Sequence, residues 1–119
     1  DAEESAFLQD FAFDYGAGLK AMDQEILEII GQAFLDQWPE DLAKIHAGLR
    51  ESKAEPVLHT AHALKATLAL FGADPASQLA ARMESMARDG ELDLIAPLLA
   101  PFIAEVGWLR GELQRRLAM

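Results

Sequence analysis

Apolar residues recur along this chain at the spacing of an α-helix, and this periodicity most constrains what the chain can fold into. The clearest seam lies near the C-terminus, where successive apolar residues are three or four positions apart: Leu92, Ile95, Leu99, Phe102, Val106, Leu109, Leu113 and Leu117. Such a seam needs partner helices on its inner face. We expect a helix over residues 92–117, with Pro97 and Pro101 either confining regular geometry to the part after them or bending its first turns.

A second seam begins after Asp23, which we expect to be an N-cap, and extends to Gln37. Pro39 is expected to kink or restart the helix, which then continues toward Arg50. The apolar positions of the whole stretch are Ile26, Ile29, Ile30, Ala33, Phe34, Leu42, Ile45 and Leu49. Residues 52–55 then predict a short polar connection.

Two shorter helices follow. The first has Pro56 in its first turn and stops at Gly72, which suits a helix C-cap. Its apolar line comprises Val57, Ala61, Leu64, Leu68 and Phe71. The second begins with Asp74 as N-cap and Pro75 at the first helical position, and it ends at Asp89-Gly90. We expect its inner side to carry Leu79, Met83 and Met86.

The N-terminal segment has a weaker pattern. Phe7, Leu8 and Phe11 predict a short helix over one end of the bundle, while residues 14–20, with Gly16 and Gly18, indicate a loop. The sequence shows no strand-like alternation and no internal repeat. We therefore expect an all-α fold, an antiparallel four-helix bundle with an additional short N-terminal helix, forming a single domain over residues 1–119.

Composition excludes several classes of function. A chain of 119 residues has no room for an ATP-binding kinase domain beside such a bundle. Its net charge of -10, from 10 basic and 20 acidic residues, disfavours nucleic acid and anionic lipid as partners. No apolar run approaches the roughly 20 residues that span a bilayer, so we expect no membrane insertion by this segment. The absence of cysteine suits a reducing compartment, and we expect a cytoplasmic protein.

His62 lies on the helix that ends at Gly72. At about 100° per residue, it falls roughly 140° from the middle of that helix's apolar line, so the imidazole is predicted to face solvent. Ala66 and Ala69 follow one and two turns later, with Lys65 on the flank. The surface around the imidazole therefore carries few bulky side chains, and a partner can approach it closely.

The residues from 61 to 88 resemble the histidine phosphotransfer (HPt) domain of two-component phosphorelays. The resemblance rests on a His-x-x-Lys motif, a glycine ten residues later, and a glutamate and a basic residue on the next helix: His62, Lys65, Gly72, Glu84 and Arg88. The chain departs from the family pattern at Ala66, where glycine is usual, and at Leu70, where a polar residue is common.

This resemblance implies that His62 is phosphorylated. The domain would accept a phosphoryl group from the aspartate of one receiver domain and pass it to the aspartate of another, as a phosphotransfer module without ATP-dependent kinase activity of its own. A neutral imidazole is nucleophilic enough to do this without a separate base. We expect no cofactor or metal on this chain, because the magnesium ion would belong to the receiver. The parent protein is expected to be a hybrid sensor histidine kinase, although a free-standing module or a chemotaxis-type kinase would have similar local residues.

The neighbouring residues have expected roles around His62. Lys65 offers a point charge to the phosphoryl oxygens, and Arg88 offers a second if its helix packs beside that of His62. Exposed Leu58 and Leu70 are candidates for a docking patch. A domain that presents one histidine to successive partners has no need to dimerise, so we expect a monomer.

Other interpretations stay open. Glu84 and Arg88 are spaced i, i+4 and would also form a simple surface ion pair, and Lys65 would also suit an ordinary solvated position. His59 and His62 lack the carboxylate and cysteine partners of a metal site. Trp38 and Trp108 are expected to pack in the core. The alternative function is a non-catalytic helical scaffold or dimerisation module, which the apolar seams alone do not distinguish from phosphotransfer.

Overall fold

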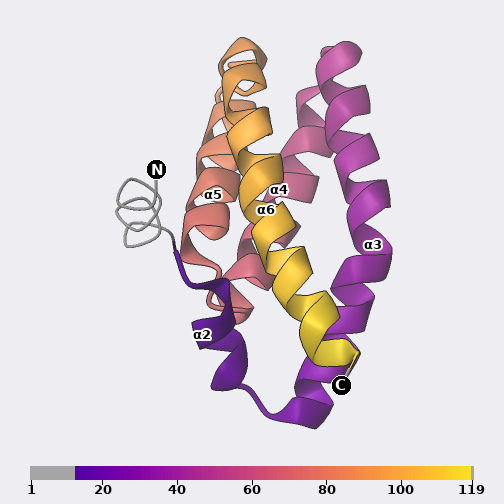
Figure 1. The fold of residues 1–119 in the computed structure, drawn as a ribbon. Coiled ribbons are helices and arrows are strands. Elements are labelled where there is room, and N and C mark those ends of the chain that lie inside the picture. The colour runs from indigo at the N-terminus through magenta and orange to yellow at the C-terminus, as the bar shows by residue number, and fades with distance from the viewer. Residues whose placement is uncertain (1–12, 119) are drawn as a thin grey trace, which may run out of the picture.

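The computed structural model describes residues 13–118. Its elements are α2 (Tyr15–Lys20), α3 (Gln24–Arg50), α4 (Ala54–Leu70), α5 (Asp74–Arg88), the 3₁₀ turn η1 (Leu92–Leu94) and α6 (Ala96–Leu117). Helices α3 to α6 run alternately up and down, and the part of the chain described contains no strand (Figure 1). The predicted all-α bundle is confirmed. The helix expected at Phe7, Leu8 and Phe11 lies outside the described residues.

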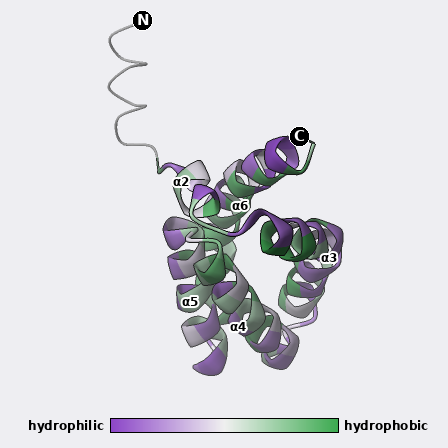
Figure 2. Ribbon diagram, turned by 90° about the horizontal axis from the view of Figure 1, so that it is seen from below, coloured by the Kyte–Doolittle hydropathy of each residue, from purple (hydrophilic) through white to green (hydrophobic). Residues whose placement is uncertain are grey.

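Each long helix packs against the next one along the chain, and α6 returns to α3 to close the bundle. Seen from below, α4 and α6 lie on opposite corners (Figure 2). Four aromatic rings connect three of the helices: Phe34 lies 5.6 Å from Phe71 and 6.2 Å from Trp38, which lies 5.9 Å from Phe102. The packing of Trp38 in the core is confirmed.

The predicted apolar stripe of α3 is wrong in its first half. The buried residues there are Leu27, Gly31 and Phe34, whereas Ile26 and Ile29 are exposed. Glycine at position 31 leaves room for α6, because a Cβ atom there would lie 3.2 Å from Leu113. The face of α3 with Gly31 is therefore buried because it packs closely against α6, although the neighbouring face with Ile26 and Ile29 is more apolar.

The ends of the helices differ slightly from the prediction. Helix α3 continues through Pro39 without a restart, and α4 begins at Ala54, inside the predicted connection. Helix α5 begins at Asp74, but the N-cap is Ala73 and no side chain caps the helix. Gly72 follows the last turn of α4 with φ of 69°, a left-handed conformation that favours glycine. The amides after Phe71 bond back to Ala69 and Leu68, which closes the helix in a Schellman motif.

The predicted loop over residues 14–20 is also wrong, because most of it forms α2. The Asp14 carboxylate accepts a hydrogen bond from the Gly16 amide at 2.9 Å and caps the helix. Tyr15 and Leu19 are buried against the bundle, and the Tyr15 hydroxyl donates to Glu105 on α6. Capping and burial together stabilise a helix that its glycines disfavour.

Gly18 sets how closely α2 approaches the bundle. A Cβ atom there would lie 2.5 Å from the Phe71 carbonyl oxygen, which is fixed backbone. We predict that Gly18→Ala lowers the free energy of unfolding by about 1–3 kcal/mol through overpacking. Gly107→Ala is the control, because nothing lies within 4 Å of that position. Urea unfolding should show the control as stable as the wild type or more so, and equal losses in both variants would contradict the packing argument.

The C-terminal seam forms η1 and α6 rather than one helix. Pro97 lies in the first turn of α6, and Pro101 lies inside the helix. Phe102, Val106, Leu109 and Leu113 are buried, as the seam predicts. The expectation for Trp108 is wrong: its side chain is 70% exposed, on the outer face of α6. Among the described residues, no helix has both the length and the apolar character needed to span a membrane.

Candidate functional site

His62 lies on the outward face of α4. Its side chain is 65% exposed, whereas the flanking positions Ala61 and Leu64 are buried. Ala66 and Ala69 lie on the same open face and are exposed. The outward orientation predicted from helical geometry is therefore confirmed, and the positions one and two turns after the imidazole carry alanine.

A buried carboxylate lies directly beside the imidazole. Glu84 on α5 is only 4% exposed at its side chain, and its oxygens bind three groups. One oxygen, Oε2, accepts from His62 Nδ1 at 2.6 Å and from the Arg88 guanidinium at 3.0 Å. The other, Oε1, lies 2.6 Å from Lys65 Nζ. Glu84 thus joins the histidine and both cations of the sequence motif.

Small side chains bring Glu84 to this position. The face of α5 that meets the rest of the bundle is rich in buried alanine: Ala76, Ala80 and Ala87. Alanines at this face let α4 and α5 pack closely. Ser77 reinforces the contact by donating its hydroxyl to the Lys65 carbonyl oxygen at 3.0 Å. A glutamate one turn after Ala80 is then held against the His62 side of α4.

The hydrogen bond to Glu84 fixes which imidazole nitrogen carries the proton. An ionised carboxylate can only accept, so in the neutral ring Nδ1 must be the donor. The lone pair is then on Nε2, the nitrogen on the far side of the ring from Nδ1. Since the His62 side chain is largely exposed, this arrangement gives α4 a solvent-facing nucleophile of defined tautomer.

The surrounding cations keep Glu84 ionised. The hydrogen bond from Lys65 is the largest influence on the pKa of Glu84, which falls from 4.5 to about 2. Burial opposes the shift, and the hydrogen bond from His62 adds to it. Glu84 therefore accepts hydrogen bonds as a carboxylate throughout the neutral range.

This shift predicts a pH dependence of stability. Because the pKa of Glu84 is lower in the folded state, its stabilisation is complete above about pH 4.5 and is lost as the pH falls toward about 2. We expect a loss on the order of 1 kcal/mol, since exposed cations cover the carboxylate and water screens them. Urea unfolding at several pH values should show the wild type losing this increment relative to Glu84→Gln. Parallel pH profiles for the two proteins would contradict the prediction.

Three further residues were predicted to belong to the site, and the structure places each in different surroundings: Gly72, Leu58 and Leu70. Gly72 lies ten residues after His62, and its left-handed conformation closes the end of α4. Leu58 is half-buried and packs against the core. Leu70 is 60% exposed. Leu70 is therefore the better placed of the two leucines to contact a partner.

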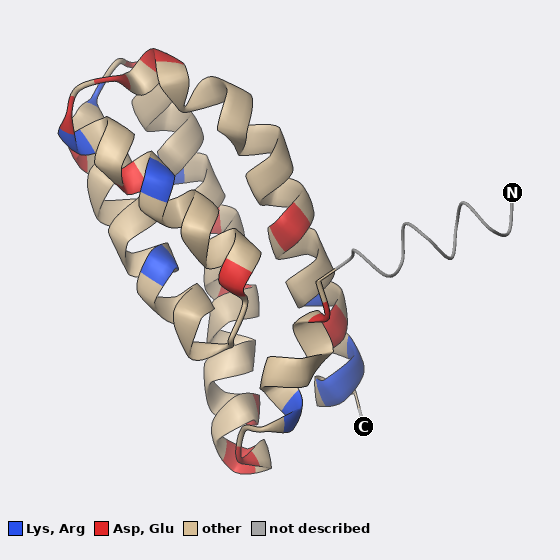
Figure 3. Ribbon diagram, turned by 90° about the vertical axis from the view of Figure 1, so that its left-hand side faces the viewer, with Lys and Arg blue, Asp and Glu red and all other residues tan. Residues whose placement is uncertain are grey.

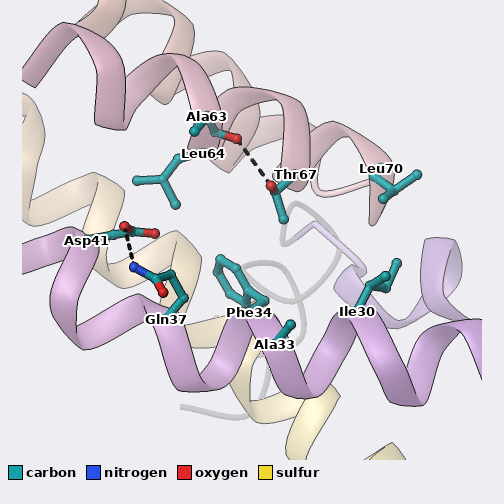
Figure 4. Close-up of a pocket in the computed structure, with 9 residues that line it drawn as sticks. All are labelled: Ile30, Ala33, Phe34, Gln37, Asp41, Ala63, Leu64, Thr67 and Leu70. Carbon is teal, nitrogen blue, oxygen red and sulfur yellow. Dashed lines mark hydrogen bonds between the residues drawn. The ribbon is translucent and has the colours of Figure 1, made fainter.

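Leu70 also borders a groove of about 540 Å³ between α3 and α4. In Figure 4 its apolar lining comes from both helices, and Gln37 and Asp41 close one end through a hydrogen bond of 3.2 Å. The residues that line it are Ile30, Ala33, Phe34, Gln37, Asp41, Ala63, Leu64, Thr67 and Leu70. Ala63 directly follows His62, so the groove adjoins the exposed face that carries the imidazole.

Sequence reasoning missed the burial of Glu84 and its bond to His62. The predicted pair with Arg88 does form, but the carboxylate lies beneath the surface. The signal was present, because Glu84 continues the three-and-four spacing from Ala80 to Ala87. Within residues 13–118, no three histidine, aspartate or glutamate side chains are grouped so that they could hold a metal ion.

Comparison with known proteins identifies the class that this bundle and site define. The model of the Hpt domain family matches residues 30–118, which is most of the chain. The chain therefore belongs to the Hpt domain family, whose members carry out histidine phosphotransfer in two-component phosphorelay signalling. A search of curated proteins and a search of solved structures each gave no match.

Proposed function

We propose that this domain is a phosphorelay intermediate that accepts a phosphoryl group on His62 from the aspartate of one receiver domain and delivers it to the aspartate of another. The supporting observation is the exposed imidazole whose Nδ1 is bound to buried Glu84. This pairing directs the Nε2 lone pair toward solvent, where a receiver can reach it. The buried carboxylate favours phosphotransfer over an ordinary surface histidine, because it fixes the tautomer in which Nε2 is the nucleophile.

This domain and the receiver domain together supply every group that the transfer requires. The Nε2 lone pair attacks phosphorus, the bond from phosphorus to the aspartyl oxygen breaks, and the receiver regains its carboxylate. The ring becomes a phosphohistidine that keeps its Nδ1 proton, and Glu84 stabilises the positive charge that develops on the imidazole. Return to a second aspartate reverses these steps. The magnesium ion that phosphoryl transfer requires is supplied by the receiver.

Lys65 and Arg88 supply charge beside the reacting nitrogen. Both now contact Glu84 and both retain solvent exposure at their side chains. Long flexible side chains can turn toward the incoming phosphoryl oxygens while one remains on the carboxylate. Glu84 therefore keeps Lys65 and Arg88 beside the imidazole before the phosphoryl group arrives.

Ala66 keeps the approach to His62 open. We predict that Ala66→Leu lowers the rate of transfer from a phosphorylated receiver about tenfold or more, because a side chain one turn from the imidazole displaces the partner. Ala43→Leu is a matched control at an exposed position of α3. Quench-flow measurement of phosphorylation would compare the two. Equal rates in both variants would show that the small residues are not needed for docking.

The central experiment mixes the domain with phosphorylated receiver domains from the same host. We expect labelled phosphate to move to this chain and then to a second receiver, in a linkage that acid breaks and alkali preserves. Incubation with ATP and magnesium alone should leave the chain unlabelled. Failure to accept label from any host receiver would favour the scaffold alternative.

A further inference from the structure

The outer face of α6 carries almost no charge. Over about three and a half turns, from Ala96 to Trp108, its exposed positions are small or apolar, and the largest is Trp108 at 70% exposure. The solvent-facing side chains of this stretch are Ala96, Pro97, Ala100, Pro101, Ala104, Gly107 and Trp108. Along α6 the ribbon carries no charged position before Glu105, and charged positions recur from there to the end of the helix (Figure 3). In a chain of net charge -10, an exposed helix face without charge over this length is a candidate interaction surface.

Helical geometry places these residues in one strip, here called the α6 face. At about 100° per residue, Pro97, Ala104 and Trp108 lie within roughly 40° of one another, opposite buried Val106 and Leu113. The nearby charges of α6 point elsewhere, since Glu105 accepts from Tyr15 on α2. Charged residues lie beyond both ends of the strip: exposed Asp93 precedes α6 on η1, and Glu112 and exposed Arg115, which form an ion pair, follow Trp108.

We propose that the α6 face binds a second copy of this chain, with the two α6 helices packed antiparallel about a two-fold axis at Ala104. In that arrangement residue i of one copy lies level with residue 208 − i of the other. The register follows from the charges at the two ends, because it sets each Arg115 beside the Asp93 of its partner copy.

The sizes of the side chains match in the same register. Trp108 lies over Ala100 of the other copy, and Pro97 lies over Gly111. The residues on the axis, Ala104 of each copy, are small, and no atom lies within 4 Å of the position that a Cβ would take at Gly107 or Gly111. Large residues thus meet small ones along the whole contact, as close helix packing requires.

Charge favours a second copy over an unlike partner. The strip has an acid at one end and a base at the other, so its electrostatic complement is the same strip reversed. Arg115 also contacts Glu112 on its own helix and would be shared between the two carboxylates.

The proposed contact leaves the imidazole free. Helix α6 lies diagonally across the bundle from α4, so both His62 side chains of a dimer would face solvent (Figure 2). The sequence led us to expect a monomer, because a domain that presents one histidine to successive partners has no need to dimerise. The proposal stands apart from the proposed function, since dimerisation is measured without any phosphoryl donor.

Sedimentation velocity over a concentration series tests the proposal on the full chain. We expect the mass to rise from 13.0 kDa toward twice that value as concentration increases to the millimolar range. Trp108→Ala should weaken association at least tenfold, and Ala104→Glu should abolish it by placing two carboxylates on the axis. Ile29→Ala is the control, because that residue is 72% exposed on α3 and should leave the dimer unchanged.

A charge exchange tests the register. Asp93→Arg and Arg115→Glu should each weaken the dimer severalfold, and the double variant should restore it. A monomer at all concentrations would overturn the proposal, as would a dimer that survives Trp108→Ala and Ala104→Glu. A monomer in which acrylamide fails to quench Trp108 would also overturn it, by assigning the α6 face to an internal cover.

Discussion

His62→Gln is expected to accept no phosphoryl group from a receiver while keeping the helical content and unfolding midpoint of the wild type. Glutamine has no ring nitrogen to attack phosphorus, so the loss should be complete rather than partial. The substituted side chain is largely exposed, and the change removes little packing. Phosphoryl labelling and circular dichroism on the same sample would measure both effects.

His59→Gln is the matched control, since His59 lies one turn before His62 on α4 and is also exposed. It should accept label at the wild-type rate, because no contact links it to Glu84 among the described hydrogen bonds. Retention of labelling in His62→Gln, or its loss in His59→Gln, would place the phosphoacceptor elsewhere and overturn the proposed function.

Glu84→Ala is expected to lower the rate of phosphoryl transfer by about 10–100-fold, the usual effect of removing a partner that orients a reacting group. Without the carboxylate, Nδ1 loses its acceptor and the ring is free to change tautomer and orientation. Lys65 and Arg88 also lose the anion that holds them beside the imidazole. Single-turnover kinetics at saturating receiver would isolate the transfer step from docking.

Glu84→Gln separates the two contributions. Its amide oxygen can still accept from Nδ1, so the tautomer is kept while the anion is lost, and we expect a rate between those of the wild type and Glu84→Ala. Nitrogen-15 shifts of the His62 ring should show the proton on Nδ1 in the wild type and a mixture in Glu84→Ala. Wild-type kinetics and an unchanged ring spectrum in Glu84→Ala would reduce the carboxylate to a structural group.

Local patterns in the sequence predicted much of the fold correctly. Apolar spacing located the four long helices, and Gly72 marked the end of α4 because its left-handed conformation favours glycine. The outward direction of His62 followed from its angle to the apolar line of α4, since that line was continuous and unambiguous. These features depend on residues within a few turns of one another.

Other features depended on neighbours that are distant in the sequence. Two adjacent faces of α3 were apolar enough to be buried, and the fit of Gly31 against Leu113 selected one of them. Helix α2 is stabilised by its Asp14 cap and by the burial of Tyr15, whose hydroxyl donates to Glu105, 90 residues later in the chain. Trp108 was expected in the core because it is a large aromatic residue next to an apolar seam, yet the four buried residues of that seam already fill the core on the other side of α6.

The sequence by itself determined that this chain makes helices and that His62 faces solvent on one of them, because both properties follow from the period of a single helix. Only the tertiary structure decided that Glu84 lies buried beside that imidazole with Lys65 and Arg88. Glu84 on α5 can orient the imidazole only because α4 places His62 beside it. Small residues between α4 and α5 bring the carboxylate and the imidazole within hydrogen-bonding distance.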